Sequence, residues 1–125
     1  MSFVGVLKYE RVSGKRSAFG RQVYKLTAPF GYDNGTYPVL CEVGFETDFA
    51  SIPRFITFLR PKNGVWRHAS VIHDKLCILA SKKLLTYKEA DDIFYYAMLD
   101  DGASKFTASF MYFWVRVNHI VTRKG

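Results

Sequence analysis

The chain has 125 residues, 49% hydrophobic and 23% charged, a composition that is typical of a globular protein and excludes a disordered one. Its length predicts a single domain over residues 1–125. The net charge of +7 favours anionic binding partners. However, the basic residues form no long run, and the sequence contains no zinc-finger, Walker or RNP-type motif. Nucleic acid is therefore a weakly supported partner.

The N-terminal half predicts short β-strands. Residues 3–10 are mostly apolar and predict a first strand that ends in a turn at residues 11–15. Residues 21–26 alternate polar and apolar side chains, as a half-buried strand does. After an Asn-Gly turn signal, residues 36–43 predict one or two further strands, interrupted at Pro38, which suits a sheet edge or a bulge.

The C-terminal half predicts three helices. The first covers residues 65–80, and the second opens at a capping box of Thr86 and Glu89 and runs to about Asp100. The third begins near Ser104, and its large apolar residues recur at helical spacing. They predict a stripe that faces the core: Phe106, Phe110, Phe113, Trp114, Val117 and Ile120. The expected fold class is therefore α+β, a small antiparallel sheet packed against about three helices.

The first predicted helix carries His73 and Asp74 side by side in an otherwise apolar stretch. Charged side chains are rarely placed inside such a helix unless they are paired, metal-bound or catalytic. Acidic partners are available before it, at Asp48, and in the second helix, at Asp91. These four residues are the candidate site.

Several segments of the chain, taken in order, resemble a family of small phage and prophage proteins, the domain of unknown function 1353 family. The segments are Thr47-Asp48-Phe49-Ala50-Ser51-Ile52-Pro53-Arg54, then Ala69-Ser70-Val71-Ile72-His73-Asp74, then Ala90-Asp91-Asp92-Ile93-Phe94. The resemblance covers roughly residues 44–118. It implies a phage or prophage origin rather than a chemistry. It further implies a place in the virion and other phage particle proteins as partners. The two cysteines are too few for a disulfide framework, so we expect synthesis in a reducing cytoplasm, here that of the host.

The local pattern of the candidate site is also similar to that of phospholipases A2. By position, His73 would act as a general base and Asp91 would orient it, while Asp74 would bind a divalent ion and Asp48 could add a ligand. This similarity implies a small hydrolase, metal-assisted or using His73 as base, that acts on the host cell envelope. The calcium-loop glycines and the disulfides of those enzymes are missing from the chain.

A zinc site built on histidines has little support from the spacing. His68 and His73 are turned about 140° from one another on an ideal helix, whereas the metalloprotease pattern places two histidines four residues apart. Cys77 is interpreted as a small buried residue, and His119 as a complement to the dipole of the last helix. His73 with the carboxylates could still hold a divalent ion such as calcium or zinc.

A structural interpretation of the candidate site stands beside the catalytic one. A buried hydrogen-bond network could pin residues 48–54 to the helices, with Ser51 or Asp48 capping a short helix at Pro53. Arg54 or Arg116 could neutralise the carboxylates. No apolar stretch of the sequence reaches membrane-spanning length without a charge.

Two functions are therefore expected as alternatives. The first is a virion-associated protein of the tail or baseplate that acts through protein contacts and uses the His-Asp network as scaffold. The second is the hydrolase. An exposed aromatic patch with Asp48, His73 and Asp91 buried would favour the first, and an open cleft that reaches all three would favour the second.

Overall fold

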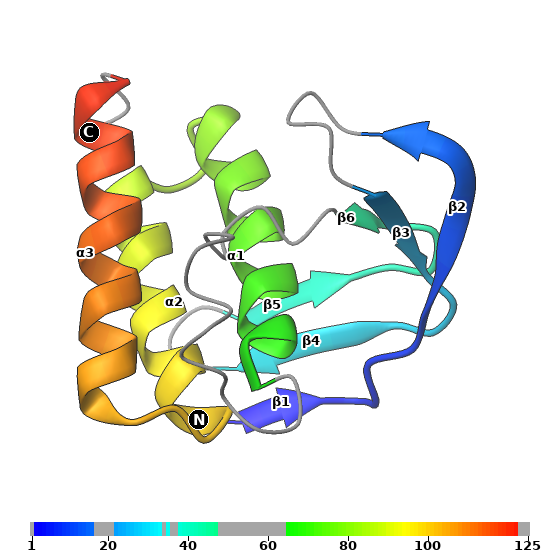
Figure 1. Ribbon diagram of the computed structural model, residues 1–125, viewed down its shortest axis with the longest axis horizontal. Coiled ribbons are helices and arrows are strands. Elements are labelled where there is room, and N and C mark those ends of the chain that lie inside the picture. The colour runs from blue at the N-terminus through cyan, green and yellow to red at the C-terminus, as the bar shows by residue number, and fades with distance from the viewer. Residues whose placement is uncertain (1, 17–21, 34, 36–37, 48–64, 123–125) are drawn as a thin grey trace.

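The computed structural model describes residues 2–16, 22–33, 35, 38–47 and 65–122. Strands occupy the N-terminal half and helices the C-terminal half (Figure 1), so the α+β fold class is confirmed. The strands are β1 (Ser2–Val4), β2 (Tyr9–Arg16), β3 (Gln22–Leu26), β4 (Phe30–Asp33), β5 (Pro38–Cys41) and β6 (Glu46–Thr47). The helices are α1 (Val65–Ser81), α2 (Tyr87–Asp100) and α3 (Lys105–Val121).

The described strands form two antiparallel sheets rather than the one small sheet that the sequence predicted. The first has the order β1-β4-β5 and the second the order β2-β3-β6. Phe3 pairs with Tyr32 in the first sheet, and Tyr24 pairs with Thr47 in the second. Strand β5 lies at an edge and begins at Pro38, a position where a residue without an N–H is tolerated.

Residues 3–10, predicted as one strand, are split between the two sheets. Gly5 lies at the end of β1 with φ of 83°, a left-handed conformation that favours glycine, and a Cβ there would approach the carbonyl oxygen of Pro29 to 2.9 Å. The predicted turn at residues 11–15 is also wrong. These residues lie within β2, whose pairing with β3 changes register between Arg11 and Arg16.

The hydrophobic core lies between the first sheet and the helices. Helix α1 contacts β5, and α2 contacts both α1 and α3. The largest fully buried apolar side chains are Leu26, Phe30, Tyr32, Ile72, Leu76, Phe94, Met98 and Met111. Among the described residues, no helix is long and apolar enough to cross a membrane.

The predicted helix starts are confirmed by their capping bonds. The Thr86 hydroxyl accepts the backbone N–H of Glu89 at 3.0 Å, and the Glu89 carboxylate accepts the N–H of Thr86 at the same distance. At the start of α3, the Ser104 hydroxyl accepts the N–H of Thr107 at 3.1 Å.

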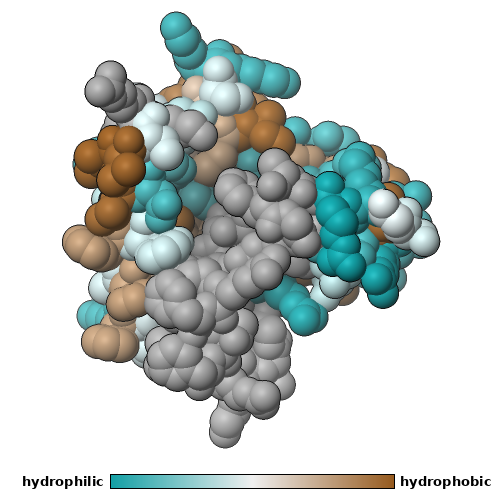
Figure 2. Space-filling model, turned by 45° about the horizontal axis from the view of Figure 1, so that its top comes forward, coloured by the Kyte–Doolittle hydropathy of each residue, from teal (hydrophilic) through white to brown (hydrophobic). Residues whose placement is uncertain are grey.

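The apolar stripe predicted to face the core along α3 points outward instead. Phe106, Phe113 and Ile120 are 76%, 67% and 60% exposed, whereas the buried side chains of α3 are Ala108, Met111 and Val115. Of the predicted stripe, Trp114 alone is partly buried against the core. Figure 2 accordingly shows brown and tan, hydrophobic residues along its left side, where α3 lies, with paler and teal residues between them. The prediction was wrong because both sides of α3 are apolar, and helical spacing does not tell which one packs on α2.

Candidate functional site

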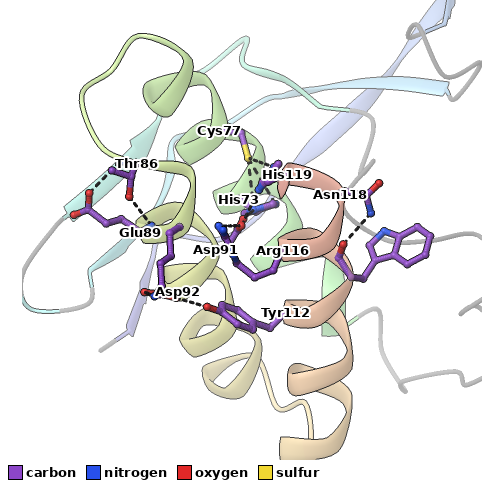
Figure 3. Close-up of polar contacts among 12 residues, drawn as sticks. His73, Cys77, Thr86, Glu89, Asp91, Asp92, Tyr112, Arg116, Asn118 and His119 are labelled. Atoms are coloured by element: carbon purple, nitrogen blue, oxygen red, sulfur yellow. Dashed lines mark hydrogen bonds and ion pairs between the residues drawn. The ribbon is translucent and has the colours of Figure 1, made fainter. Parts of the chain in front are cut away.

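The buried carboxylate of Asp91 is the point where the three helices meet. Asp91 lies on α2 and is fully buried. Its Oδ1 lies 2.7 Å from Nε2 of His73 on α1. Its Oδ2 accepts hydrogen bonds from Nη1 of Arg116 at 3.0 Å and Nδ1 of His119 at 2.7 Å, both on α3 (Figure 3). These four residues are called the Asp91 cluster below.

Helical spacing explains why these side chains converge. His73 and Cys77 are four residues apart on α1 and share one face, as do Arg116 and His119, three apart on α3. Figure 3 shows both faces turned toward Asp91, which lies between them on α2.

Two aromatic rings hold the imidazoles in place. Phe94, one turn after Asp91, stacks on His73 with the ring centroids 4.4 Å apart and an interplanar angle of 28°. Tyr87, at the first residue of α2, lies against His119 at 4.8 Å. Each imidazole is therefore oriented by a carboxylate on its edge and by a neighbouring ring.

The thiol of Cys77 lies between the two imidazoles. Its Sγ is 3.5 Å from Nε2 and 3.9 Å from Nδ1 of His73, and 3.9 Å from Nε2 of His119. One ligand atom from each of these three residues lies within 4.8 Å of the others. Two imidazoles and a thiol are a donor set that suits a zinc-class ion.

Burial and hydrogen bonding together set the protonation states of His73 and Asp91. Burial lowers the pKa of His73, although the Asp91 carboxylate acts in the opposite direction. Burial alone would raise the pKa of Asp91, but the hydrogen bonds from His119 and His73 outweigh it and hold that pKa below the usual 3.8. Near neutral pH, Asp91 is therefore an ionised acceptor. His73 is neutral and donates its Nε2 proton to Asp91, which leaves the lone pair on Nδ1.

The structure brings together some of the predicted site residues and separates others. His73, Asp91 and Arg116 lie in one cluster. Asp74 does not join them. It follows His73 by about 100° around the helix axis and accepts a hydrogen bond from the Thr47 hydroxyl of β6. The predicted site residues Asp48, Ser51 and Arg54 lie outside the described residues.

Two residues of the site were not predicted. Cys77 was interpreted as a small buried residue, yet it is partly exposed and contacts both imidazoles. His119 was interpreted as a complement to the helix dipole, yet its Nδ1 bonds to Asp91. The sequence does contain signals that could have identified them: Cys77 follows His73 by four residues and His119 follows Arg116 by three, spacings that place each pair on one face of its helix.

Comparison with known proteins identifies a family but no activity. No curated protein matches the chain, and no solved structure does. A family model described as "Protein of unknown function (DUF1353)" matches residues 24–115, a range that includes His73, Cys77 and Asp91 and ends just before Arg116. Because this match covers well over half of its length, the chain belongs to the DUF1353 family of proteins of unknown function.

Proposed function

We propose that this protein is a component of a larger assembly and works by binding another protein through the outer face of α3. The observation that carries the proposal is the exposure of this apolar face on the side of α3 opposite the core. The outer face consists of Phe106, Phe110, Phe113, Val117, Ile120 and Val121. Soluble proteins rarely leave such a contiguous apolar patch in water unless it is a contact surface.

The spacing of the outer face suits a partner helix. Steps of four and three residues alternate from Phe106 through Phe110, Phe113 and Val117 to Ile120, an average of about 3.5, which is the repeat of a helix-packing seam. An apolar stripe of this kind fits against a matching stripe or groove on another helix.

Charge favours a different protein over a second copy of this chain. Helix α3 contains Lys105 and no aspartate or glutamate, its Arg116 is paired with Asp91 of the same chain, and the chain has a net charge of +7. Two copies paired through α3 would therefore bring like charges together. The proposed partner is a helix whose apolar residues are flanked by acidic ones.

A pocket next to the outer face could receive an anchoring side chain of the partner. It has a volume of about 400 Å³ and is lined by Asp92, Tyr95, Tyr96, Ser109 and Tyr112. Ser109 lies one helical turn from two phenylalanines of the outer face, so the pocket adjoins that face. Aromatic-lined pockets of this kind often hold the side chains that dominate binding energy.

The burial of His73 and Asp91 favours this function over a hydrolase. The two residues are 2% and 0% exposed. A general base has to come within hydrogen-bond distance of the proton that it removes from the substrate or from water, and such burial opposes this. In the proposed function, the Asp91 cluster joins the three helices and fixes the position of α3.

In its finer form, the proposal is that the assembly is the tail or baseplate of a phage, made in the host cytoplasm and carried in the virion. Its support is the resemblance of residues 47–54, 69–74 and 90–94 to phage and prophage proteins. The test is to probe particles, purified after induction of the source strain, with an antibody against the chain. A fixed copy number per particle would support this form, and absence from intact particles would contradict it.

To test the contact surface, Phe113 is first replaced by a photo-cross-linking amino acid, and the cross-link is formed in the cell that produces the protein. The cross-linked partner is identified, purified, and titrated with wild type, Phe113→Ala and the control Val43→Ala. We expect Phe113→Ala to weaken binding about tenfold or more, since buried aromatic anchors contribute about 2 kcal/mol. Val43 is 59% exposed near the turn after β5, and its variant should bind normally.

Equal affinity of wild type and Phe113→Ala would contradict the proposal. Cross-links to a second copy of the chain alone would show that the outer face is a homodimer interface instead.

A further inference from the structure

We infer that His73, Cys77 and His119 form a binding site for a single zinc-class divalent ion. This inference goes beyond the proposed function and does not depend on the outer face of α3. It rests on the convergence of three ligand side chains from two helices and on the carboxylate that orients both histidines.

The ligand atoms lie close to the separations that a bound ion requires. A tetrahedral zinc ion about 2.0–2.1 Å from nitrogen and about 2.3 Å from sulfur places those two atoms roughly 3.6 Å apart. The Sγ of Cys77 is 3.9 Å from Nδ1 of His73 and 3.9 Å from Nε2 of His119. The three ligand atoms lie within 4.8 Å of one another. Because Sγ is also 3.5 Å from Nε2 of His73, the Cys77 side chain has to rotate to bring Sγ into line with the Nδ1 lone pair around an ion.

Asp91 provides the supporting contacts that histidine ligands of metals usually have. Such a histidine commonly donates its second ring N–H to a carboxylate, which fixes its orientation and makes the ligating nitrogen more basic. Asp91 accepts from His73 through Oδ1 and from His119 through Oδ2. With those bonds kept, the ion would bind Nδ1 of His73 and Nε2 of His119.

The chemistry of the donor set selects the ion. Imidazole nitrogen and thiolate sulfur suit zinc and related transition metals, whereas calcium and magnesium take oxygen ligands. Three protein ligands leave one position of a tetrahedral ion for water or another donor. Binding through the thiolate releases the proton of Cys77, so one proton leaves the protein for each ion bound.

The first experiment uses the full chain without a histidine tag, treated with a chelator and then dialysed. Titration with Zn²⁺ alone should show one ion bound per chain, a rise in the melting temperature, and a binding heat that changes with the ionisation heat of the buffer because a proton is released. Titration with Co²⁺ should produce the near-ultraviolet charge-transfer absorption of a cobalt–thiolate bond.

Variants then locate the site. Cys77→Ser and His119→Gln should each weaken Zn²⁺ binding about tenfold or more, and Cys77→Ser should remove the cobalt–thiolate absorption. His68→Gln and Cys41→Ala are the matched controls, since they alter the histidine and the cysteine that are not among the three proposed ligands. Both controls should bind Zn²⁺ as wild type does.

Either of two results would overturn the inference. One is a folded wild-type chain that takes up less than one Zn²⁺ per chain or gives no cobalt–thiolate absorption, a result that needs no variant. The other is Zn²⁺ binding of equal affinity in wild type and Cys77→Ser. Circular dichroism of each variant without metal distinguishes a lost ligand from a lost fold.

Discussion

Replacing the central carboxylate of the Asp91 cluster gives the most direct test of how the helices are held together. In Asp91→Asn, the amide keeps one acceptor oxygen and turns the second acceptor into an NH₂ donor. That donor then faces either His73 or the pair of Arg116 and His119, which donate to Asp91 in the native chain.

The expected loss of stability follows from the burial of these groups. Removing one partner of a buried ion pair typically costs about 3–5 kcal/mol. The side chains of Arg116 and His119 are 14% and 13% exposed, so water relieves part of the penalty and the lower end applies. We expect a loss of about 3 kcal/mol, or roughly 12 °C in melting temperature at about 4 °C per kcal/mol.

The measurement is urea unfolding at pH 7, followed by circular dichroism, with Asp92→Asn as the control. Asp92 is the next residue on the same helix, and its carboxylate is 40% exposed and bonded to Lys88 and Tyr112. Its variant should lose at most about 1 kcal/mol. A loss below about 1 kcal/mol for Asp91→Asn, or one no larger than that of the control, would refute the reasoning.

Three further predictions follow from the same structure. Burial lowers the pKa of His73 in the folded chain, so as the pH falls the unfolded chain protonates His73 at a higher pH than the folded chain does. The free energy of unfolding should therefore decrease as the pH falls below 6.5. A series of urea unfolding curves from pH 7 to pH 5 that shows no decrease would contradict this. Thr86→Ala removes the cap of α2 and should cost about 1 kcal/mol in the same assay, and no measurable cost would mean that the capping box does not stabilise the helix. Met111→Ala, on the buried side of α3, should lower the free energy of unfolding by about 2–5 kcal/mol. Phe113→Ala, on the outer face, should change it by about 0.5 kcal/mol or less. A larger loss for Phe113→Ala than for Met111→Ala would show that α3 is turned the other way.

The sequence predicted the helices better than the strands because helix signals are local. The capping bonds of Thr86 and Ser104 are made within three residues, so they can be recognised in the chain itself. The division of residues 3–10 between two sheets was missed because alternation of side chains does not indicate where a strand leaves its sheet. The chain leaves the first sheet at Gly5, which has a positive φ, and the presence of a glycine in the sequence does not by itself predict that conformation.

The candidate site was predicted in part for a related reason. His73 and Asp91 stood out because charged residues in apolar helices need partners, and Arg116 was a plausible counter-charge. Cys77 and His119 were missed because their roles depend on how α1 and α3 are rotated about their axes. The same unknown rotation led to the wrong orientation of the apolar stripe on α3.

Strand β2 is tied less firmly to the rest of the molecule than the first sheet is. Most side chains of β2 are at least partly exposed, whereas β4 and β5 contribute Phe30, Tyr32, Val39 and Cys41 to the core. The free energy needed to open a region grows with the apolar surface that it buries. Amide protons of β2 should therefore exchange with deuterium through openings that leave β4, β5 and the helices folded. In such an opening β2 separates from β3, whose Leu26 stays in the core, while the Asp91 cluster stays closed.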